Sequence, residues 1–292
     1  MDYKIPFSSR NFTFLKNLAR DYAGLDLGDN KKWMIYSRLS HLLIALNIKS
    51  FDEYCNLLQQ GNKEYLRTFV HGVTIHETQF FREEHHFEYL KNKFLPEFTA
   101  GSNKNSNLKI LSAGCSTGQE PYSIGMSLLE TMDSLALDPF ILAVDIDSYV
   151  LELAEKGIYS YEAVKKVKKE RLKRFFLKGK NTQKGYAKVK DELRRLIAFR
   201  EMNLASNWSL RDQFDVIFCR NVILYFTKEV KEKVIEKFHQ YLKPSGLLIM
   251  GYSEILDDFE KEFRLIGNSV YERIGEKEQT PSTKLKKGEG EL

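Results

Sequence analysis

Hydrophobic residues recur at helical spacing through the first 75 residues of the chain. Apolar positions three or four residues apart form four successive stripes, the pattern of helices with one buried face. The stripes are Leu15, Leu18, Ala19 and Tyr22, then Ile35, Leu39, Leu42, Leu43 and Leu46, then a third up to Leu58, then Tyr65, Leu66, Phe69 and Val70. We expect Asn11 to cap the first helix, and Ser50 with Glu53 to form a capping box at the third. Residues 1–75 are therefore predicted to form a small all-helical domain, which offers no clustered acid, base or nucleophile.

Residues 76–107 connect this domain to the rest of the chain. They begin among β-forming residues and become a helix that carries Phe87, Leu90, Phe94 and Leu95 on one face. The closing run, AGSNKNSN, has the small and polar composition of a flexible linker. We predict an interdomain segment followed by a linker.

A buried strand that opens into a glycine turn is predicted within residues 108–123, LKILSAGCSTGQEPYS. The apolar run breaks at Gly114 and the turn continues to Gly118. Pro121 fits the first turn of a following helix, where its missing N–H costs nothing. A strand, a glycine turn and a helix N-terminus together form a ligand cradle.

Strands and helices go on alternating after the cradle, which is typical of an open α/β sheet. The next segments are buried strands at 140–147, 196–204 and 214–223, a helix at 228–242, a strand at 247–252 and an antiparallel hairpin at 263–274. Open α/β sheets bind ligands at the carboxyl ends of their strands. We therefore expect Asp145, Asn203, Arg220 and Asn221 to lie at the ligand site.

Three kinds of site fit parts of the cradle. The turn satisfies the G-x-S-x-G of a nucleophile elbow, but His239, which alone among histidines follows Ser116, lies in a charged amphipathic helix. A dinucleotide site would need the six-residue G-x-G-x-x-G, which is absent. A nucleoside such as S-adenosylmethionine needs close backbone approach, a carboxylate for its ammonium group and an acid for its ribose hydroxyls. Glu120 and Asp145 stand where those two acids are needed, which favours the third kind.

Length and composition limit the remaining choices. The 292 residues, 42% of them hydrophobic, can fill an α/β domain and a second, smaller domain. No apolar run is long enough to span a membrane, and the N-terminus lacks the core of a signal peptide, so we expect a cytoplasmic protein without membrane insertion. Cys55, Cys115 and Cys219 show no paired metal spacing, and we expect reduced thiols.

The histidines offer no metal motif of known spacing. His76 and Glu77 begin an H-E-x-x-H, but the fifth position is Phe80. His85 and His86 are adjacent on a predicted helix and cannot easily face one ion. We expect no metal.

Charge is unevenly distributed along the chain. Residues 156–200 hold sixteen Lys and Arg against four Asp and Glu, although the whole chain carries only +5. This basic segment is either a solvated helix face or a docking surface for an acidic partner, and its exposed lysines include Lys165, Lys166, Lys168, Lys169 and Lys173. The tail at 276–292 is too polar to pack, and we expect it to be disordered.

Four motifs together resemble the CheR type of chemotaxis receptor protein-glutamate O-methyltransferases. In chain order they are TIHETQFFREEHHF, AGCSTGQEPYSI, FCRNVILYF and KPSGLLIMGYSE, and the resemblance runs from about residue 12 to residue 274. It implies an N-terminal helical domain and a Rossmann-like S-adenosylmethionine-dependent methyltransferase domain at 108–275. It also implies a small antiparallel β subdomain inserted at about 158–196. There the turn residues GKNTQKG could be flanked by YAKVKDEL and LIAFREM as strands.

The resemblance also implies roles for individual residues. The implied cofactor-binding residues are His76, Thr78, Arg82, Glu120, Asp145, Asn203, Leu204, Arg220 and Asn221, and the implied catalytic residues are Arg82 and Tyr225. Glu120 would hold the methionine amino group and Asp145 the ribose. His76 stands where the family commonly has Asn, and Gln119 where Glu is frequent. A histidine can still donate a hydrogen bond through one ring nitrogen.

A glutamate acceptor would explain why no catalytic histidine is found. Its side chain has a reference pKa of about 4.3, so it is already ionised and can attack the sulfonium methyl without a general base. S-adenosylhomocysteine would be the other product. Arg82 would hold the acceptor carboxylate, and the ring of Tyr225 would form the side of the pocket next to the methyl group. The alternatives are a linker salt bridge for Arg82 and a half-buried strand-end aromatic for Tyr225.

The implied partner is the cytoplasmic helical region of chemotaxis receptors, methylated during adaptation. We expect no nucleic acid partner and a monomeric enzyme. Two other functions stay open. One is an RNA methyltransferase, because the basic segment could follow phosphates. The other is a non-enzymatic S-adenosylmethionine-binding adaptor that docks on receptors.

Overall fold

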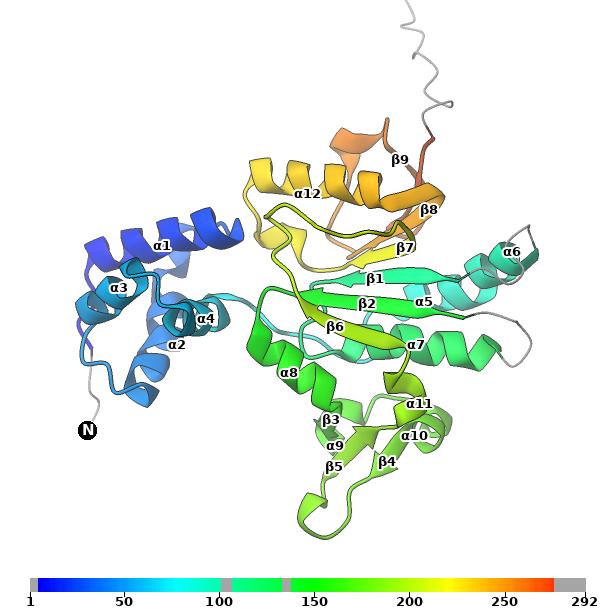
Figure 1. Ribbon diagram of the computed structural model, residues 1–292, viewed down its shortest axis with the longest axis horizontal. Coiled ribbons are helices and arrows are strands. Elements are labelled where there is room, and N and C mark those ends of the chain that lie inside the picture. The colour runs from blue at the N-terminus through cyan, green and yellow to red at the C-terminus, as the bar shows by residue number, and fades with distance from the viewer. Residues whose placement is uncertain (1–4, 101–106, 133–137, 276–292) are drawn as a thin grey trace, which may run out of the picture.

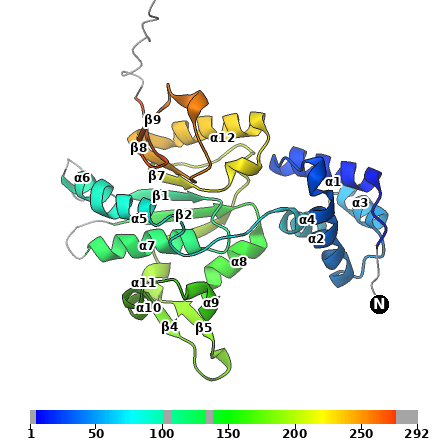
Figure 2. The ribbon, with the colours of Figure 1, turned by 180° about the vertical axis from the view of Figure 1, so that it is seen from behind.

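The structure is a computed structural model that describes residues 5–100, 107–132 and 138–275. Figure 1 shows a helical domain, a central seven-stranded sheet flanked by helices, and a small three-stranded sheet below it. Figure 2 shows from behind that the helical domain lies beyond one end of the strands of the central sheet. The predicted tail at 276–292, and residues 101–106 of the predicted linker, lie outside the described residues.

The helical domain has the helices that its apolar stripes predict. Its elements are α1 (Ser9–Ala23), the 3-10 turn η1 (Asp29–Lys31), α2 (Lys32–Ala45), α3 (Phe51–Gln59) and α4 (Lys63–Val73). Leu15, Leu39 and Phe69 from three of these helices are fully buried in its core. Two predicted members of the stripes, Tyr22 and Leu46, are exposed instead, because they lie at the ends of their helices.

The helix caps differ in detail from the prediction. Ser8, rather than Asn11, caps α1: its hydroxyl accepts from the Asn11 N–H at 3.1 Å, and the Asn11 side chain accepts from the Ser8 N–H at 2.9 Å. Ser50 caps α3 through the Glu53 N–H as predicted. The Glu53 carboxylate, however, accepts from the N–H of Lys49, one residue before the cap, so the capping box is only half formed.

The interdomain segment is bound to the sheet by its helices. These are α5 (His85–Tyr89), the π-helical turn η2 (Leu90–Phe94) and α6 (Leu95–Ala100), which cover the predicted helix. Phe87, Leu90 and Leu95 are buried in one cluster with Ile110 and Phe218 of the sheet. The extended residues between α4 and α5 are thus held at both ends.

The central sheet confirms the predicted α/β fold class. In spatial order its strands are β6 (Ile197–Glu201), β2 (Phe140–Asp145), β1 (Lys109–Ala113), β7 (Phe214–Cys219), β8 (Leu242–Met250), β10 (Val270–Arg273) and β9 (Phe263–Gly267). The first five run parallel to one another. The predicted hairpin, β9 with β10, pairs antiparallel and closes the far edge. The sequence predicted every one of these strands.

Helices cover both faces of the sheet, which explains the unbroken apolar runs of its strands. The helices are α7 (Gln119–Met132), α8 (Ser148–Lys156) and α12 (Lys228–Tyr241), with short 3-10 turns η4 (Ile223–Tyr225) and η5 (Asp257–Phe259). Ile110 of β1 packs with Ile124 of α7, whereas its neighbour Leu111 packs with Phe238 of α12. Successive side chains of a strand point to opposite faces, so β1 contributes to both cores.

Strand order reverses between β1 and β7. From β1 the chain moves to β2 and β6 on one side, and β7 and β8 continue on the other. A reversal of this kind opens a crevice at the carboxyl ends of the two central strands. Gly114 and Arg220 are the first residues beyond those ends.

The basic segment folds as a separate small sheet, as predicted for 158–196. Its elements are β3 (Ile158–Ser160), α9 (Tyr161–Val164), α10 (Lys169–Phe175), β4 (Phe176–Lys178), the 3-10 turn η3 (Asn181–Gln183), β5 (Tyr186–Val189) and α11 (Asp191–Arg194), with antiparallel strand order β3-β5-β4. The residues LIAFREM were wrongly offered as one of its strands. Their core, Ile197–Glu201, forms β6 of the central sheet, where its backbone pairs in parallel with β2.

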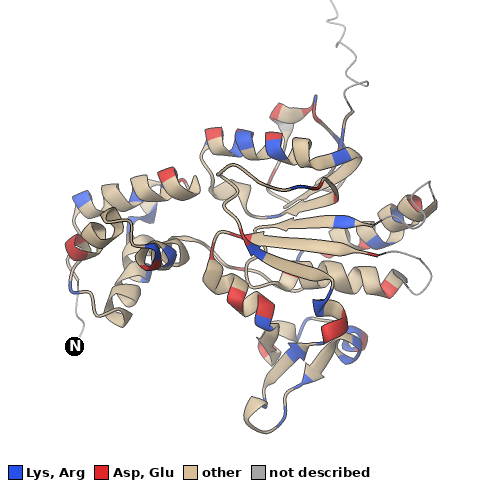
Figure 3. Cartoon of the chain, in the orientation of Figure 1, with Lys and Arg blue, Asp and Glu red and all other residues tan. Residues whose placement is uncertain are grey.

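One basic residue of this subdomain is not on its surface. Figure 3 marks the Lys and Arg residues along the subdomain. Arg171 is only 7% exposed and makes a two-pronged ion pair with Glu130 of α7, at 2.6 Å and 3.0 Å. Its guanidinium also lies 3.9 Å from the ring centroid of Phe81. Arg171 therefore belongs neither to a solvated face nor to a docking surface, and it attaches the subdomain to the rest of the molecule.

Candidate functional site

A pocket lies at the carboxyl edge of the central sheet, where the helical domain, the interdomain segment and the sheet meet. Every residue with an implied role lines it, namely His76, Thr78, Arg82, Glu120, Asp145, Asn203, Leu204, Arg220, Asn221 and Tyr225. These residues come from five separate stretches of the chain. The fold therefore brings the implied set together, while the role of each residue stays a prediction.

The glycine turn forms the floor of the pocket. Gly114 has φ +82°, and a Cβ there would approach Val222 to 2.4 Å, so a larger residue would clash as well as be strained. Ser116 also has a positive φ, +50°. This turn directs the Ser116 N–H at the Asp145 carboxylate, 2.8 Å away. The Ser116 hydroxyl donates to the His76 carbonyl at 3.2 Å, so its partner is not the imidazole that a nucleophile elbow would need.

Asp145 ends β2 with its carboxylate held by two backbone N–H groups. Ser116 donates to one oxygen at 2.8 Å and Asp147 donates to the other at 3.0 Å. Burial raises the pKa of Asp145, and these two hydrogen bonds partly oppose that rise. A carboxylate can accept about four hydrogen bonds. Asp145 therefore keeps one acceptor position on each oxygen, a pattern that suits two adjacent hydroxyls.

Glu120, in the first turn of α7, is the second carboxylate of the pocket, and its side chain is 12% exposed. It accepts from the Ser112 hydroxyl at 2.8 Å and pairs with Arg220 at 3.1 Å. Burial raises its pKa, and the charge of Arg220 opposes that rise. Arg220 also pairs with Glu83 at 3.2 Å. Two carboxylates share this one guanidinium, so the group retains net negative charge and can attract a cation.

The loop after β7 is fixed by a residue that the sequence argument missed. Glu254 is 2% exposed, and its carboxylate accepts from the backbone N–H groups of Asn221, Val222 and Gly251 at 2.6 to 2.9 Å. Asn221 has φ +59°, an uncommon value for a residue with a side chain. The GYSE motif that ends with Glu254 was noticed only as part of the family resemblance.

Asn203 and Leu204 were implied to lie near the adenine. The Asn203 amide donates to the carbonyl of Tyr22 in the helical domain, and its oxygen accepts from the Ala205 N–H at 2.9 Å. Asn203, in the loop after β6, therefore uses its amide to contact the helical domain and its oxygen to hold the loop. Leu204 is 5% exposed and offers the pocket an apolar surface.

The helical domain forms one wall of the pocket, which its sequence did not predict. Leu25 makes an antiparallel bridge with Phe226, and the Asp26 N–H donates to the Tyr225 carbonyl at 2.8 Å. Lys31 lines the same wall, with its ammonium 5.9 Å from the ring centroid of Tyr225. The apolar pattern of the second helix gave no means of placing Lys31 against the sheet domain.

Arg82 and Thr78 line the opposite side, with Thr78 in the irregular stretch after α4 and Arg82 in the turn before α5. The Arg82 guanidinium donates to the carbonyl of Glu77 at 3.1 Å. The backbone carbonyl of Arg82 accepts a hydrogen bond from the Arg220 guanidinium. The backbone of Arg82 is thus tied to the sheet domain while its side chain faces the pocket with a neutral partner.

Comparison with known proteins identifies the family. The model of the CheR methyltransferase SAM binding domain matches residues 76–271, and that of the CheR all-alpha domain matches residues 10–74. The chain belongs to the CheR methyltransferase family. The two matched segments correspond to the sheet domain with its interdomain segment, and to the helical domain.

Relatives of this family match nearly the whole chain. A chemotaxis protein methyltransferase of Escherichia coli (strain K12) is 35% identical over 93% of this chain and 93% of its own length. Chemotaxis protein methyltransferase 2 of Pseudomonas aeruginosa is 36% identical over 91% of this chain and 93% of its own length. Both domains therefore have counterparts in these methyltransferases. Among the described residues, no helix is long and apolar enough to cross a membrane.

The pocket fits S-adenosylmethionine, the cofactor of this family. The paired acceptor positions of Asp145 suit the ribose hydroxyls, and the acidic group around Glu120 suits the ammonium of the methionine part. The glycine turn allows close backbone approach between them. These assignments follow from the chemistry of the groups, and each stays a prediction for its residue.

Cofactor affinity should fall as the pH is lowered. Glu120 and Asp145 must be ionised to bind an ammonium group and hydroxyl donors, and burial raises the pKa of both above the ordinary values in the unliganded protein. Protonation therefore begins at a higher pH than for an exposed carboxylate. Binding should release protons, measurable by titration calorimetry at a series of pH values below neutral in buffers of different ionisation enthalpy.

Lowering the pH should have the opposite effect on the folding stability of the unliganded protein. With raised pKa values, the two carboxyls contribute stability below their unfolded pKa, and this contribution is lost as the pH rises through the folded pKa.

Glu120→Gln and Asp145→Asn should each reduce the proton release on binding. An affinity independent of pH, with no proton release, would contradict the assignment of these carboxylates.

Proposed function

We propose that this protein transfers the methyl group of S-adenosylmethionine to glutamate side chains on the cytoplasmic helical region of chemotaxis receptors. A carboxylate oxygen of the acceptor forms the new bond to the methyl carbon as the bond from that carbon to sulfur breaks. The electron pair of the broken bond stays on sulfur. The products are a glutamate methyl ester and S-adenosylhomocysteine, and the charges of carboxylate and sulfonium cancel.

The observation that carries this proposal is the distribution of charge in the pocket. Two largely buried carboxylates, Asp145 and Glu120, occupy the side formed by the sheet. Two cationic side chains, Arg82 and Lys31, line it from the interdomain segment and the helical domain. A cationic donor suits the first side and an anionic acceptor suits the second. A glutamate carboxylate matches that requirement.

The chemistry needs alignment rather than proton transfer. A glutamate is ionised at neutral pH, so attack on the sulfonium methyl needs no base. Holding the carboxylate, the methyl group and sulfur in line is worth up to roughly 7 to 11 kcal/mol in well-oriented systems. Exclusion of water from the ion pair also favours a transition state in which opposite charges cancel. We propose that Arg82 holds the acceptor carboxylate and that Tyr225, fixed by the bridge at Phe226, walls the methyl group.

The decisive experiment is a radiolabel transfer assay. The purified protein is incubated with S-adenosylmethionine labelled in its methyl group, together with receptor cytoplasmic fragments or with RNA of the same concentration. Base-labile label on the receptor fragment supports the glutamate ester. Label on RNA alone would support an RNA methyltransferase. Tight cofactor binding without transfer to either acceptor would support a receptor-binding adaptor.

The basic subdomain, 158–196, should dock the receptor without contacting the cofactor. No residue of 158–196 lines the described pocket. Lys165, Lys169 and Lys173 are exposed, and Lys165 pairs with Glu162 within the subdomain. Lys168 pairs instead with Glu84 of the interdomain segment at 2.8 Å and is better left unchanged. Replacing the three exposed lysines with Glu should raise the KM for receptor roughly fivefold, because exposed charge contacts are each worth less than about 1 kcal/mol. The salt dependence of the rate should weaken, since these interactions are screened within about 10 Å at 0.1 M salt.

A matched variant controls for the change in net charge. Lys228, Lys233 and Lys261 are exposed lysines of the sheet domain outside the subdomain, and their replacement with Glu should leave the KM for receptor unchanged. The Kd for S-adenosylhomocysteine should be the same in all three proteins. If reversal in the subdomain alters neither the KM nor the salt slope, the basic segment is a solvated face.

A further inference from the structure

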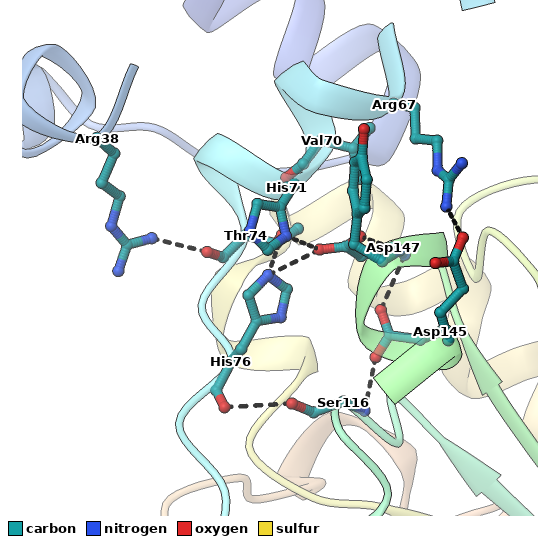
Figure 4. Close-up of polar contacts among 11 residues, drawn as sticks. Arg38, Arg67, Val70, His71, Thr74, His76, Ser116, Asp145 and Asp147 are labelled. Carbon is teal, nitrogen blue, oxygen red and sulfur yellow. Dashed lines mark hydrogen bonds and ion pairs between the residues drawn. The ribbon is translucent and has the colours of Figure 1, made fainter. Parts of the chain in front are cut away.

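Three metal-ligating side chains meet between the helical domain and the sheet domain. His71 lies in the last turn of α4, His76 in the interdomain segment, and Asp147 directly before α8. Figure 4 shows both imidazoles directed at the carboxylate of Asp147. The ligand atoms of all three side chains lie within 4.8 Å of one another.

The two imidazoles converge on a single oxygen atom. Nδ1 of His71 is 2.7 Å, and Nε2 of His76 is 2.9 Å, from the same Oδ2 of Asp147. The Asp147 side chain is fully buried, while those of His71 and His76 are 43% and 21% exposed. The two rings are stacked, with an interplanar angle of 15°. The cluster therefore combines a buried anion with two nitrogen ligands that solvent can reach.

The remaining polar atoms of the cluster already have partners that hold it in place. The other oxygen of Asp147 accepts from the Tyr149 N–H at 2.9 Å and caps α8. Thr74 Oγ1 donates to the carbonyl of Val70 at 2.7 Å, and therefore accepts from Nε2 of His76 at 2.9 Å. That ring nitrogen thus has two oxygen acceptors for one hydrogen. A metal ion could take the place of this hydrogen, with the ring proton on Nδ1.

We propose that His71, His76 and Asp147 bind a divalent transition-metal ion, best matched by Zn²⁺, which ties the helical domain to the sheet domain. Two imidazoles and one carboxylate are ligands that Zn²⁺ takes, at about 2.0 to 2.2 Å. Neighbouring ligands of a tetrahedral ion are then roughly 3.3 Å apart, so the two nitrogens need to move away from Oδ2 by only about 0.5 Å. Solvent at the exposed ring of His71 supplies the fourth ligand.

The proposed ion takes no part in methyl transfer. It would act through the interface, since α4 and α8 also meet there through the ion pair of Arg67 with Glu152 and the hydrogen bond of Tyr149 to Glu64. It would also lie next to the cofactor site, because the Asp147 N–H donates to Asp145. The sequence argument expected no metal because it tested His76 only with Glu77. It had no means of pairing His71 with a carboxylate 76 residues away.

Calorimetric titration of the purified, chelator-treated full chain with Zn²⁺ tests the proposal. The wild type should bind one ion, and its melting temperature should rise with Zn²⁺ concentration. His71→Ala should weaken binding more than about 100-fold, since even the loss of a second-shell partner costs 10- to 100-fold. His76→Asn should do the same while retaining a hydrogen bond to Asp147, so a loss of binding in this variant cannot be ascribed to an open interface.

Two controls separate this cluster from other ligands. His85→Ala removes an exposed histidine outside the cluster and should leave the affinity for Zn²⁺ unchanged. The absorption spectrum of the Co²⁺-loaded protein should lack a thiolate charge-transfer band, because the three cysteines are buried and apart from the cluster. Absence of binding by the wild type, equal affinity in His76→Asn, or a thiolate band would each overturn the proposal.

Discussion

Replacing Asp145 with Ala should weaken the binding of S-adenosylmethionine and S-adenosylhomocysteine by about 1.5 to 3 kcal/mol, roughly 10- to 150-fold. The carboxylate is buried at the end of β2, and two backbone N–H groups fix its orientation. Its remaining acceptor positions would hold both ribose hydroxyls, and hydrogen bonds to a charged group are the stronger kind. Titration calorimetry with S-adenosylhomocysteine measures the loss without turnover.

The variant Asp145→Asn distinguishes charge from shape. Asn keeps the size of the side chain, but its NH₂ cannot accept from the N–H of Ser116 or Asp147, so it should also bind weakly. Glu201→Gln is the matched control, because Glu201 ends the neighbouring strand β6 in register with Asp145 and is exposed. It should leave affinity unchanged. Wild-type affinity in a folded Asp145→Ala protein would refute the ribose assignment.

Replacing Arg82 with Ala should lower kcat by about 100-fold, with little change in cofactor affinity. The guanidinium lines the pocket and donates to the neutral carbonyl of Glu77, so its charge is available to an acceptor carboxylate. Without this guanidinium the acceptor carboxylate is no longer aligned, whereas the cofactor site remains intact. Initial rates on receptor fragments, combined with calorimetry on S-adenosylhomocysteine, separate the two effects.

Two further variants make this test specific. Arg82→Lys keeps the charge but not the planar fork that binds a carboxylate at two points, so it should recover only part of the rate. Lys31→Ala removes the cation of the helical wall and should raise the KM for receptor more than it lowers kcat. If Arg82→Ala methylates at the wild-type rate, Arg82 is structural and the interdomain segment serves only as a connection.

The fold was predictable because its signals are local. Apolar stripes specified the helices of the N-terminal domain, and the unbroken apolar runs specified strands that are covered on both faces. The hairpin at 263–274 was also predicted from its turn residues, whereas the inserted sheet at 158–196 was implied by the family resemblance. The cap at Ser8 was missed because both Ser8 and Asn11 are good capping residues, and the choice between them depends on the backbone angle.

The candidate site was only partly predictable, because only some of its residues give a local signal in the sequence. Residues that end strands, such as Asp145 and Arg220, could be assigned to one edge because parallel strands share their carboxyl ends. Glu254, which fixes the turn at Asn221, gave no such signal. Its importance comes from three backbone N–H groups that converge on it after folding.

The sequence alone thus determined the elements, the order of the domains, the glycine turn and the family motifs. Only the tertiary structure decided that Lys31 lines the pocket, that Arg171 is buried against Glu130, and that His71 and His76 meet at Asp147. The physical reason is that periodicity and turn chemistry act over a few residues. Contacts between domains depend instead on how finished surfaces pack, which no spacing along the chain records.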